Sequence, residues 1–108
     1  MEIYLWRDDM NDVRADEEIR LDVSNIYTSK DFQKYLQNNL QFPDFYGMNW
    51  DAFWDTITGL IELPETVVIE GWIDLVKNLP NDANMFRELL QRYNTEYPMC
   101  KCIIRYLD

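Results

Sequence analysis

Short strand patterns alternate with longer helical patterns along this chain, and this alternation constrains its fold more than any other feature. The segment Thr66 to Glu70 is β-branched and mostly apolar, which is typical of a buried strand. Ile19 to Val23 alternates apolar and charged residues, and Lys101 to Leu107 is a third predicted strand. Because helical segments separate the strands, we predict an α/β fold in which a small sheet packs on helices. The 108 residues leave room for one core, so the whole chain, 1–108, is expected to form a single domain.

Capping and breaking residues set the bounds of the predicted helices. A short polar side chain can accept a hydrogen bond from a first-turn amide, and the expected N-caps are Thr28, Asn49 and Asp82. The first of these helices stops at Pro43, and the second runs from about Trp50 to Thr58 and ends at Gly59. Trp72 to Asn78 is a shorter helix that closes at Pro80. Gly47, in the aromatic loop before the second helix, is expected to supply a positive φ.

The N-terminal part has a different pattern. Glu2 to Trp6 alternates polar and apolar residues, as an edge strand would, whereas Arg7 to Glu18 is acidic and loop-like. We therefore treat residues 1–18 as an N-terminal extension that adds either one more strand or an arm for a particular partner.

The charge balance limits the partners. Lys and Arg number 10 against 20 Asp and Glu, which gives a formal net charge of -10. Nucleic-acid binders gain affinity when Lys and Arg displace counterions, so direct binding to nucleic acid is not expected. A negative surface instead favours a basic protein partner. The chain also has no histidine, the side chain that most often serves as general base or metal ligand, and this excludes catalytic triads and most zinc enzymes. We expect no enzyme, metal or cofactor.

Cysteine usage and hydropathy bear on the compartment. Cys100 and Cys102 are expected to be buried free thiols, since free cysteine behaves as a small hydrophobe. No apolar run approaches the roughly 18 residues of a membrane span, and no leader-like segment opens the chain. These features favour a cytoplasmic protein without a membrane partner.

The predicted helix from Trp50 to Thr58 carries the most informative pattern. At about 100° per residue, Trp50, Phe53 and Ile57 share the core side, and Trp54 lies at the border of that side. A second stripe is formed by Asp51, Asp55 and Thr58. Two carboxylates at i and i+4 repel each other by a few tenths of a kcal/mol, so an acidic pair beside aromatic residues calls for an explanation.

Four explanations fit the residues alone. The stripe is a solvated acidic face, a paired-carboxylate enzyme site, a protein-recognition surface with Tyr46 and Trp54 as aromatic anchors, or a Ca²⁺ or Mg²⁺ site completed by Glu62. Carboxylates on one exposed helical stripe lack the cleft that glycoside hydrolysis needs. The spacing also matches no EF-hand loop.

The segment Phe42-Pro-Asp-Phe-Tyr-Gly-Met-Asn-Trp-Asp-Ala-Phe-Trp-Asp-Thr-Ile-Thr-Gly59 resembles the central segment of the barstar family of intracellular ribonuclease inhibitors. The resemblance extends over Ile19 to Leu107, through Pro64, the strand before Trp72, and Phe86-Arg87-Glu88. It implies a three-stranded parallel sheet packed on helices. It also implies a monomeric inhibitor or immunity protein that binds a basic ribonuclease, or the nuclease domain of a toxin, in a 1:1 heterodimer.

The resemblance also implies which residues contact the partner. By position, Asp55 is similar to the aspartate that enters the phosphate-binding site of the ribonuclease, and Asp51 to a second acidic contact. The implied partner-binding residues are Phe45, Tyr46, Gly47, Asn49, Asp51, Trp54, Asp55, Thr58 and Glu88. Phe45 stands where the family has a tyrosine, so its contact is apolar, and Met48 and Trp50 enlarge the loop. An acidic adaptor or nucleic-acid mimic that binds a basic protein other than a ribonuclease is the alternative.

Overall fold

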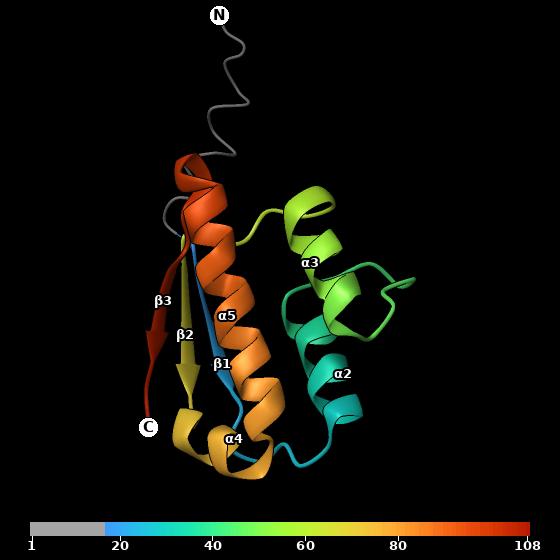
Figure 1. The fold of residues 1–108 in the computed structure, drawn as a ribbon, viewed down its shortest axis with the longest axis vertical. Helices are drawn as coiled ribbons and strands as arrows, with labels where there is room; N and C mark the ends of the chain where they lie inside the picture. Colours follow the sequence, from blue (N-terminus) through green and yellow to red (C-terminus); the bar gives the residue numbers. More distant parts are fainter. Residues whose placement is uncertain (1–16) are drawn as a thin grey trace, which may run out of the picture.

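The computed structural model describes residues 17–108, in which one sheet of three parallel strands lies beside four helices (Figure 1). This confirms the predicted α/β class and the parallel sheet. The elements, in chain order, are β1 (Glu18–Asp22), α2 (Ser29–Asn39), α3 (Trp50–Gly59), β2 (Thr66–Glu70), α4 (Trp72–Asn78), α5 (Pro80–Glu96), the 3-10 turn η1 (Pro98–Cys100) and β3 (Ile103–Tyr106). The predicted strand Glu2 to Trp6 lies outside the described residues.

The strand order determines where the helices lie. The strands follow one another as β1-β2-β3, with α2 and α3 between the first two and α4 and α5 between the last two. Crossovers between parallel strands are almost always right-handed, so a consecutive order places all the connecting helices on one face. Figure 1 shows this arrangement, with α5 running antiparallel to the strands and α2 and α3 beside it.

The covered face of the sheet and all four described helices share one hydrophobic core. Val67 and Ile69 of the central strand are 3% and 0% exposed and face the helices. Phe32 of α2, Phe53 of α3 and Phe86 of α5 meet edge to face, with ring centroids 5.4 Å apart for Phe32 and Phe86 and 5.7 Å apart for Phe53 and Phe86. Edge-to-face pairs contribute about 1 kcal/mol each beyond their burial. These rings fix α3 against α5.

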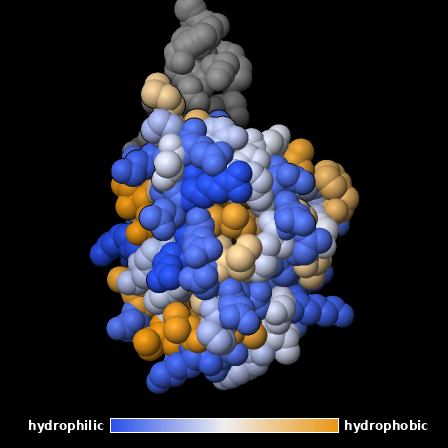
Figure 2. Space-filling view, in the orientation of Figure 1, coloured by the Kyte–Doolittle hydropathy of each residue, from blue (hydrophilic) through white to orange (hydrophobic). Residues whose placement is uncertain are grey.

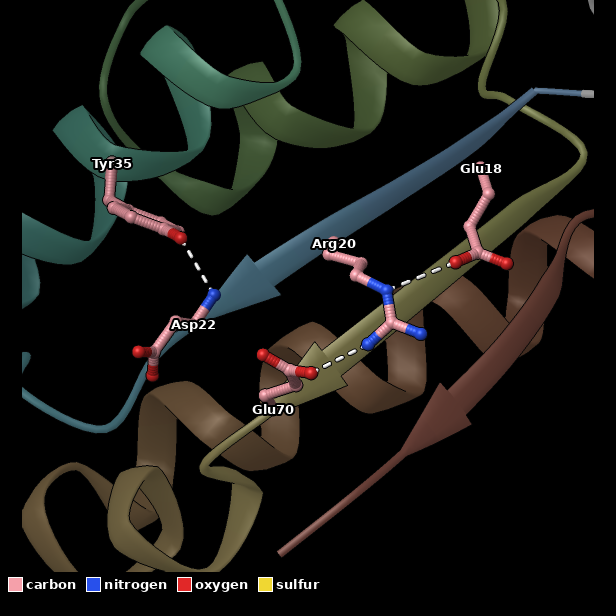
Figure 3. A network of polar contacts seen from close by, with 5 residues as sticks. All are labelled: Glu18, Arg20, Asp22, Tyr35 and Glu70. Carbon is pink, nitrogen blue, oxygen red and sulfur yellow. Dashed lines mark hydrogen bonds and ion pairs between the residues drawn. The ribbon is translucent and has the colours of Figure 1, made fainter.

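The other face of the sheet is charged. On this face the Arg20 guanidinium lies 3.2 Å from the Glu18 carboxylate and 2.6 Å from that of Glu70 (Figure 3). Separately, the hydroxyl of Tyr35 on α2 accepts a hydrogen bond from the Asp22 amide of the edge strand β1. Val68 points to this face but is fully buried, with Arg20 and Arg105 as its register neighbours on β1 and β3. The hydrocarbon stems of arginine can cover such a residue.

Two of the three predicted N-caps are confirmed. Thr28 accepts a hydrogen bond from the Asp31 amide at 3.1 Å, and Asn49 accepts one from the Ala52 amide at 2.7 Å. The prediction for Asp82 is wrong, because α5 begins at Pro80 and Asp82 lies in its first turn. Proline suits the first helical position, where its missing N–H costs nothing.

Gly47 and Cys100 also differ from expectation. The positive φ of the aromatic loop belongs to Met48, at 61°, and Gly47 has none. Gly47 instead allows close packing, since a Cβ there would lie 3.1 Å from that of Ala52. Cys102 is buried as predicted, but Cys100 is exposed because it ends the 3-10 turn before β3.

Candidate protein-binding site

The acidic stripe of α3 is exposed because the core holds the opposite side of the helix. Phe53, Thr56 and Ile57 are buried, whereas Asp51 and Asp55 are exposed. Asn49 sets where the helix begins, and α3 extends one residue beyond the predicted end, through Gly59. Because the two aspartates are four positions apart, their carboxylates follow one another by about 6 Å along the helix.

A groove between α3 and α5 runs beside this stripe. Its volume is about 440 Å³, and it is lined by Trp50, Asp51, Trp54, Asp55, Met85, Leu89 and Arg92. Four of these seven lining residues are apolar, Met85 is 36% exposed, and Figure 2 shows apolar surface among hydrophilic residues on this side of the molecule. Two carboxylates therefore stand at an aromatic and aliphatic groove, which is the composition of a hot spot for a cationic side chain of a partner.

Arg92 is a cation within this acidic site. Its guanidinium carbon lies 4.2 Å from the centre of the Trp54 ring, and its Nε lies 2.7 Å from the Glu96 carboxylate. Both contacts hold the guanidinium over Trp54, which is half-buried. The α3 surface is thus acidic with one positive spot at its α5 side.

The loop before α3 is held in place by contacts of the Tyr46 side chain with α2 and with Phe42. Tyr46 is only 6% exposed, and its hydroxyl donates a hydrogen bond to the side-chain oxygen of Gln33, which is 3% exposed. The Tyr46 ring packs on Phe42 with centroids 4.9 Å apart. Burial raises the pKa of Tyr46 well above its ordinary value. Tyr46 therefore supports the loop from its buried side, and its role as an aromatic anchor for a partner stays a prediction.

Phe45 is the aromatic residue that this loop exposes. Its side chain is 75% exposed, more than that of any other aromatic residue among residues 17–108. The turn is closed by hydrogen bonds to the Pro43 carbonyl, from the Tyr46 amide at 3.0 Å and from the Gln37 side chain at 3.0 Å. An exposed phenyl ring on a tied loop is suited to an apolar contact with a partner.

Asp82 connects the helices that carry the site. Its carboxylate accepts hydrogen bonds from the Trp50 indole N–H at 2.9 Å and from the Ser29 hydroxyl. Trp50 also packs edge to face on Phe53, with centroids 5.2 Å apart. This junction of α2, α3 and α5 gives Asp82 a structural role in place of the predicted cap.

Six of the nine predicted site residues fall into two groups. Asp51, Trp54 and Asp55 lie together at the α3–α5 groove. Phe45, Gly47 and Asn49 lie at the N-terminal end of α3, where Asn49 also donates from its side-chain amide to the Gly47 carbonyl at 3.2 Å.

Thr58 and Glu88 lie at the margins. The Thr58 hydroxyl donates to the Trp54 carbonyl at 2.6 Å, and Glu88 is exposed on α5, one turn before Arg92. Sequence reasoning missed Met85, Leu89 and Arg92. Their helical spacing places them on one face of α5, but the sequence does not say that this face meets α3.

The structure also bears on a metal site and on a membrane-spanning helix. Within residues 17–108, no group of three His, Cys, Asp or Glu side chains is placed to hold a metal ion, so Asp51, Asp55 and Glu62 do not converge. None of the described helices is both long enough and apolar enough to cross a membrane.

Comparison with known proteins identifies a family and a similar protein. The family model described as Barstar (barnase inhibitor) matches residues 17–105, nearly the whole described chain. A Bacillus subtilis (strain 168) protein named "Putative ribonuclease inhibitor YrdF" is 49% identical over 37 residues, which cover 34% of this chain and 41% of that protein. The match therefore spans less than half of the length of that relative.

Proposed function

The chain belongs to the barstar (barnase inhibitor) family, and from this premise we propose that it inhibits a basic ribonuclease by covering the active site with α3 and the loop before it. The observation that carries the proposal is the exposed pair Asp51 and Asp55 at the rim of the α3–α5 groove. Carboxylates can take the positions of RNA phosphates in a basic cleft because both are anions that Arg and Lys recognise.

The proposed contacts divide by role. Asp55 enters the phosphate-binding site of the ribonuclease and Asp51 contacts its rim, while Trp54 and Phe45 supply the apolar area. Glu88 adds a peripheral acidic contact from α5. A residue buried in the complex governs chiefly the dissociation rate, whereas rim charges govern association. The proposed complex is 1:1, forms in the cytoplasm and protects the cell from a self-made or delivered nuclease.

The test is an RNA-cleavage assay with barnase, whose inhibition gives the family its description, as the first probe ribonuclease. Wild-type protein is expected to inhibit cleavage, and Asp55→Ala to weaken inhibition by about 30-fold or more, as for one partner lost from a buried charge pair. If barnase is not inhibited, the assay is repeated on ribonucleases captured from the source organism.

A matched control separates a site from a diffuse charge effect. Asp74→Ala removes the same charge from α4, at the other end of the molecule from α3 (Figure 1). It is expected to leave inhibition unchanged. Equal losses from both variants, with native circular dichroism, would refute the assigned surface. Binding that a substrate-like nucleotide fails to displace would point to the adaptor alternative.

A further inference from the structure

The strand β3 forms one edge of the described sheet, and part of its backbone has no partner among residues 17–108. Among the described strands only β2 pairs with it. The Ile103 amide donates to the Glu65 carbonyl at 2.7 Å, and the Leu107 amide donates to the Ile69 carbonyl at 2.8 Å. Successive residues of a strand direct their backbone groups to opposite sides. The N–H and C=O groups of Ile104 and Tyr106 therefore point outward, and no described residue pairs with them.

The residue before this stretch shows what the edge can bind. The backbone N–H and C=O of Cys102 also point outward from the sheet. The side-chain amide of Asn94 on α5 pairs with both groups, accepting from the Cys102 N–H at 2.7 Å and donating to its C=O at 2.7 Å. These are the two hydrogen bonds that a neighbouring strand would make. Asn94 thus occupies the first position of a strand-pairing site and leaves the next two open.

A groove of about 580 Å³ runs along this open edge, between β3 and α5. Among its lining residues are Arg87, Gln91 and Lys101, and none of the described residues that line it is acidic. The groove is therefore locally positive in a chain of net charge -10. Because charges more than about 8 Å apart are largely screened at physiological salt, the two cations that line the groove act on a bound segment more strongly than the distant acidic residues do.

We propose that this β3–α5 groove binds an extended, acidic peptide segment of a partner protein by strand addition. The outward groups of Ile104 and Tyr106 supply four backbone hydrogen bonds, as in other modes of strand addition to a sheet edge. Arg87 and Lys101 pair with acidic side chains of the segment. A second copy of β3 is a poor occupant, since it would bring the same cations together. The site is separate from the acidic α3 surface.

The test is a nuclear magnetic resonance titration of the full chain with a soluble peptide in which glutamate alternates with valine. We expect a dissociation constant of about 0.1 to 1 mM and amide shifts centred on Ile104 and Tyr106. A peptide with its alternate backbone nitrogens methylated is expected not to bind. Lys101→Glu is expected to weaken binding about fivefold, while Lys34→Glu on α2, with the same charge change, leaves it unaltered.

Several outcomes would overturn the proposal. These are no shifts at 1 mM peptide, equal binding of the methylated peptide, or equal effects of the two lysine variants. Slow hydrogen exchange of the Ile104 and Tyr106 amides in the free protein would show that the edge is already paired. Sedimentation as a dimer that Lys101→Glu alters would assign the edge to a second copy.

Discussion

The hydrogen bond between Tyr46 and Gln33 is predicted to be a main support of the loop that precedes α3. Tyr46→Phe removes the donor and leaves the Gln33 side-chain oxygen, in a residue that is 3% exposed, without it. A buried polar group left unsatisfied costs about 1 to 3 kcal/mol, so we expect a loss of about 2 kcal/mol. At about 4 to 8 °C per kcal/mol for a chain of this size, the midpoint of thermal unfolding falls by about 10 °C.

Removing the acceptor of this hydrogen bond is predicted to cost less than removing its donor. In Gln33→Leu the Tyr46 hydroxyl keeps the Asn49 carbonyl, 3.3 Å away, as an acceptor, so the expected loss is about 1 kcal/mol. The double variant has neither polar group, and its loss is expected to be about 1 kcal/mol, well below the sum of the two single losses. The coupling energy between the two side chains is therefore about 2 kcal/mol.

Urea unfolding followed by circular dichroism measures all three free energies of unfolding. Losses that simply add in the double variant would show that the hydrogen bond contributes nothing and would refute this reasoning. A change in the urea dependence itself would indicate an altered unfolded state. Because the bond connects the loop to α2, Tyr46→Phe is also expected to weaken ribonuclease inhibition, although Tyr46 itself is only 6% exposed.

Three further predictions concern single positions. Gly71→Ala is expected to lose about 3 kcal/mol in urea unfolding, because φ is 76° and the new Cβ would lie 2.6 Å from the Ser24 Cβ, whereas Gly59→Ala, with nothing within 4 Å, gains about 0.5 kcal/mol. Burial raises the pKa of Tyr106 to about 12, so tyrosine ionises at lower pH in the unfolded state. Stability is therefore lost as pH rises from about 10 through 12, and Tyr106→Phe should reduce this loss when unfolding is measured across that pH range. Arg92→Ala should change stability by less than about 1 kcal/mol but speed association with a basic ribonuclease at low salt in stopped-flow mixing, and an unchanged rate would contradict its place in the acidic site.

Local signals in the sequence predict the type of most described elements. Asn49 marks the start of α3 because its side chain can satisfy a first-turn amide whatever the rest of the chain does. The run Thr66 to Glu70 similarly identifies a central strand, since only a strand buried on both faces needs apolar residues at successive positions.

Features that depend on two elements could not be predicted in this way. Tyr46 reads as an exposed aromatic in the sequence, and only the packing of the loop on α2 brings Gln33 to its hydroxyl. Asp82 is a plausible cap by type, but Pro80 starts the helix two residues earlier and leaves Asp82 to accept from Trp50. The position of Arg92 over Trp54 likewise requires the pairing of α3 with α5.

The rigidity of α3 links the fold to the proposed inhibition. The helix is held by its Asn49 cap, by the bond from Trp50 to Asp82, and by Phe53 among the core rings. Association costs less when the contacting groups are already ordered, because few side chains and no loop must be immobilised on binding. The carboxylates of Asp51 and Asp55 stand on such a fixed helix, so their repulsion is already offset by the folding of the core. A cationic cleft that receives them would therefore gain their attraction at the cost of ordering only the two side chains, which explains how an acidic pair that is slightly unfavourable in the free helix can be favourable for recognition.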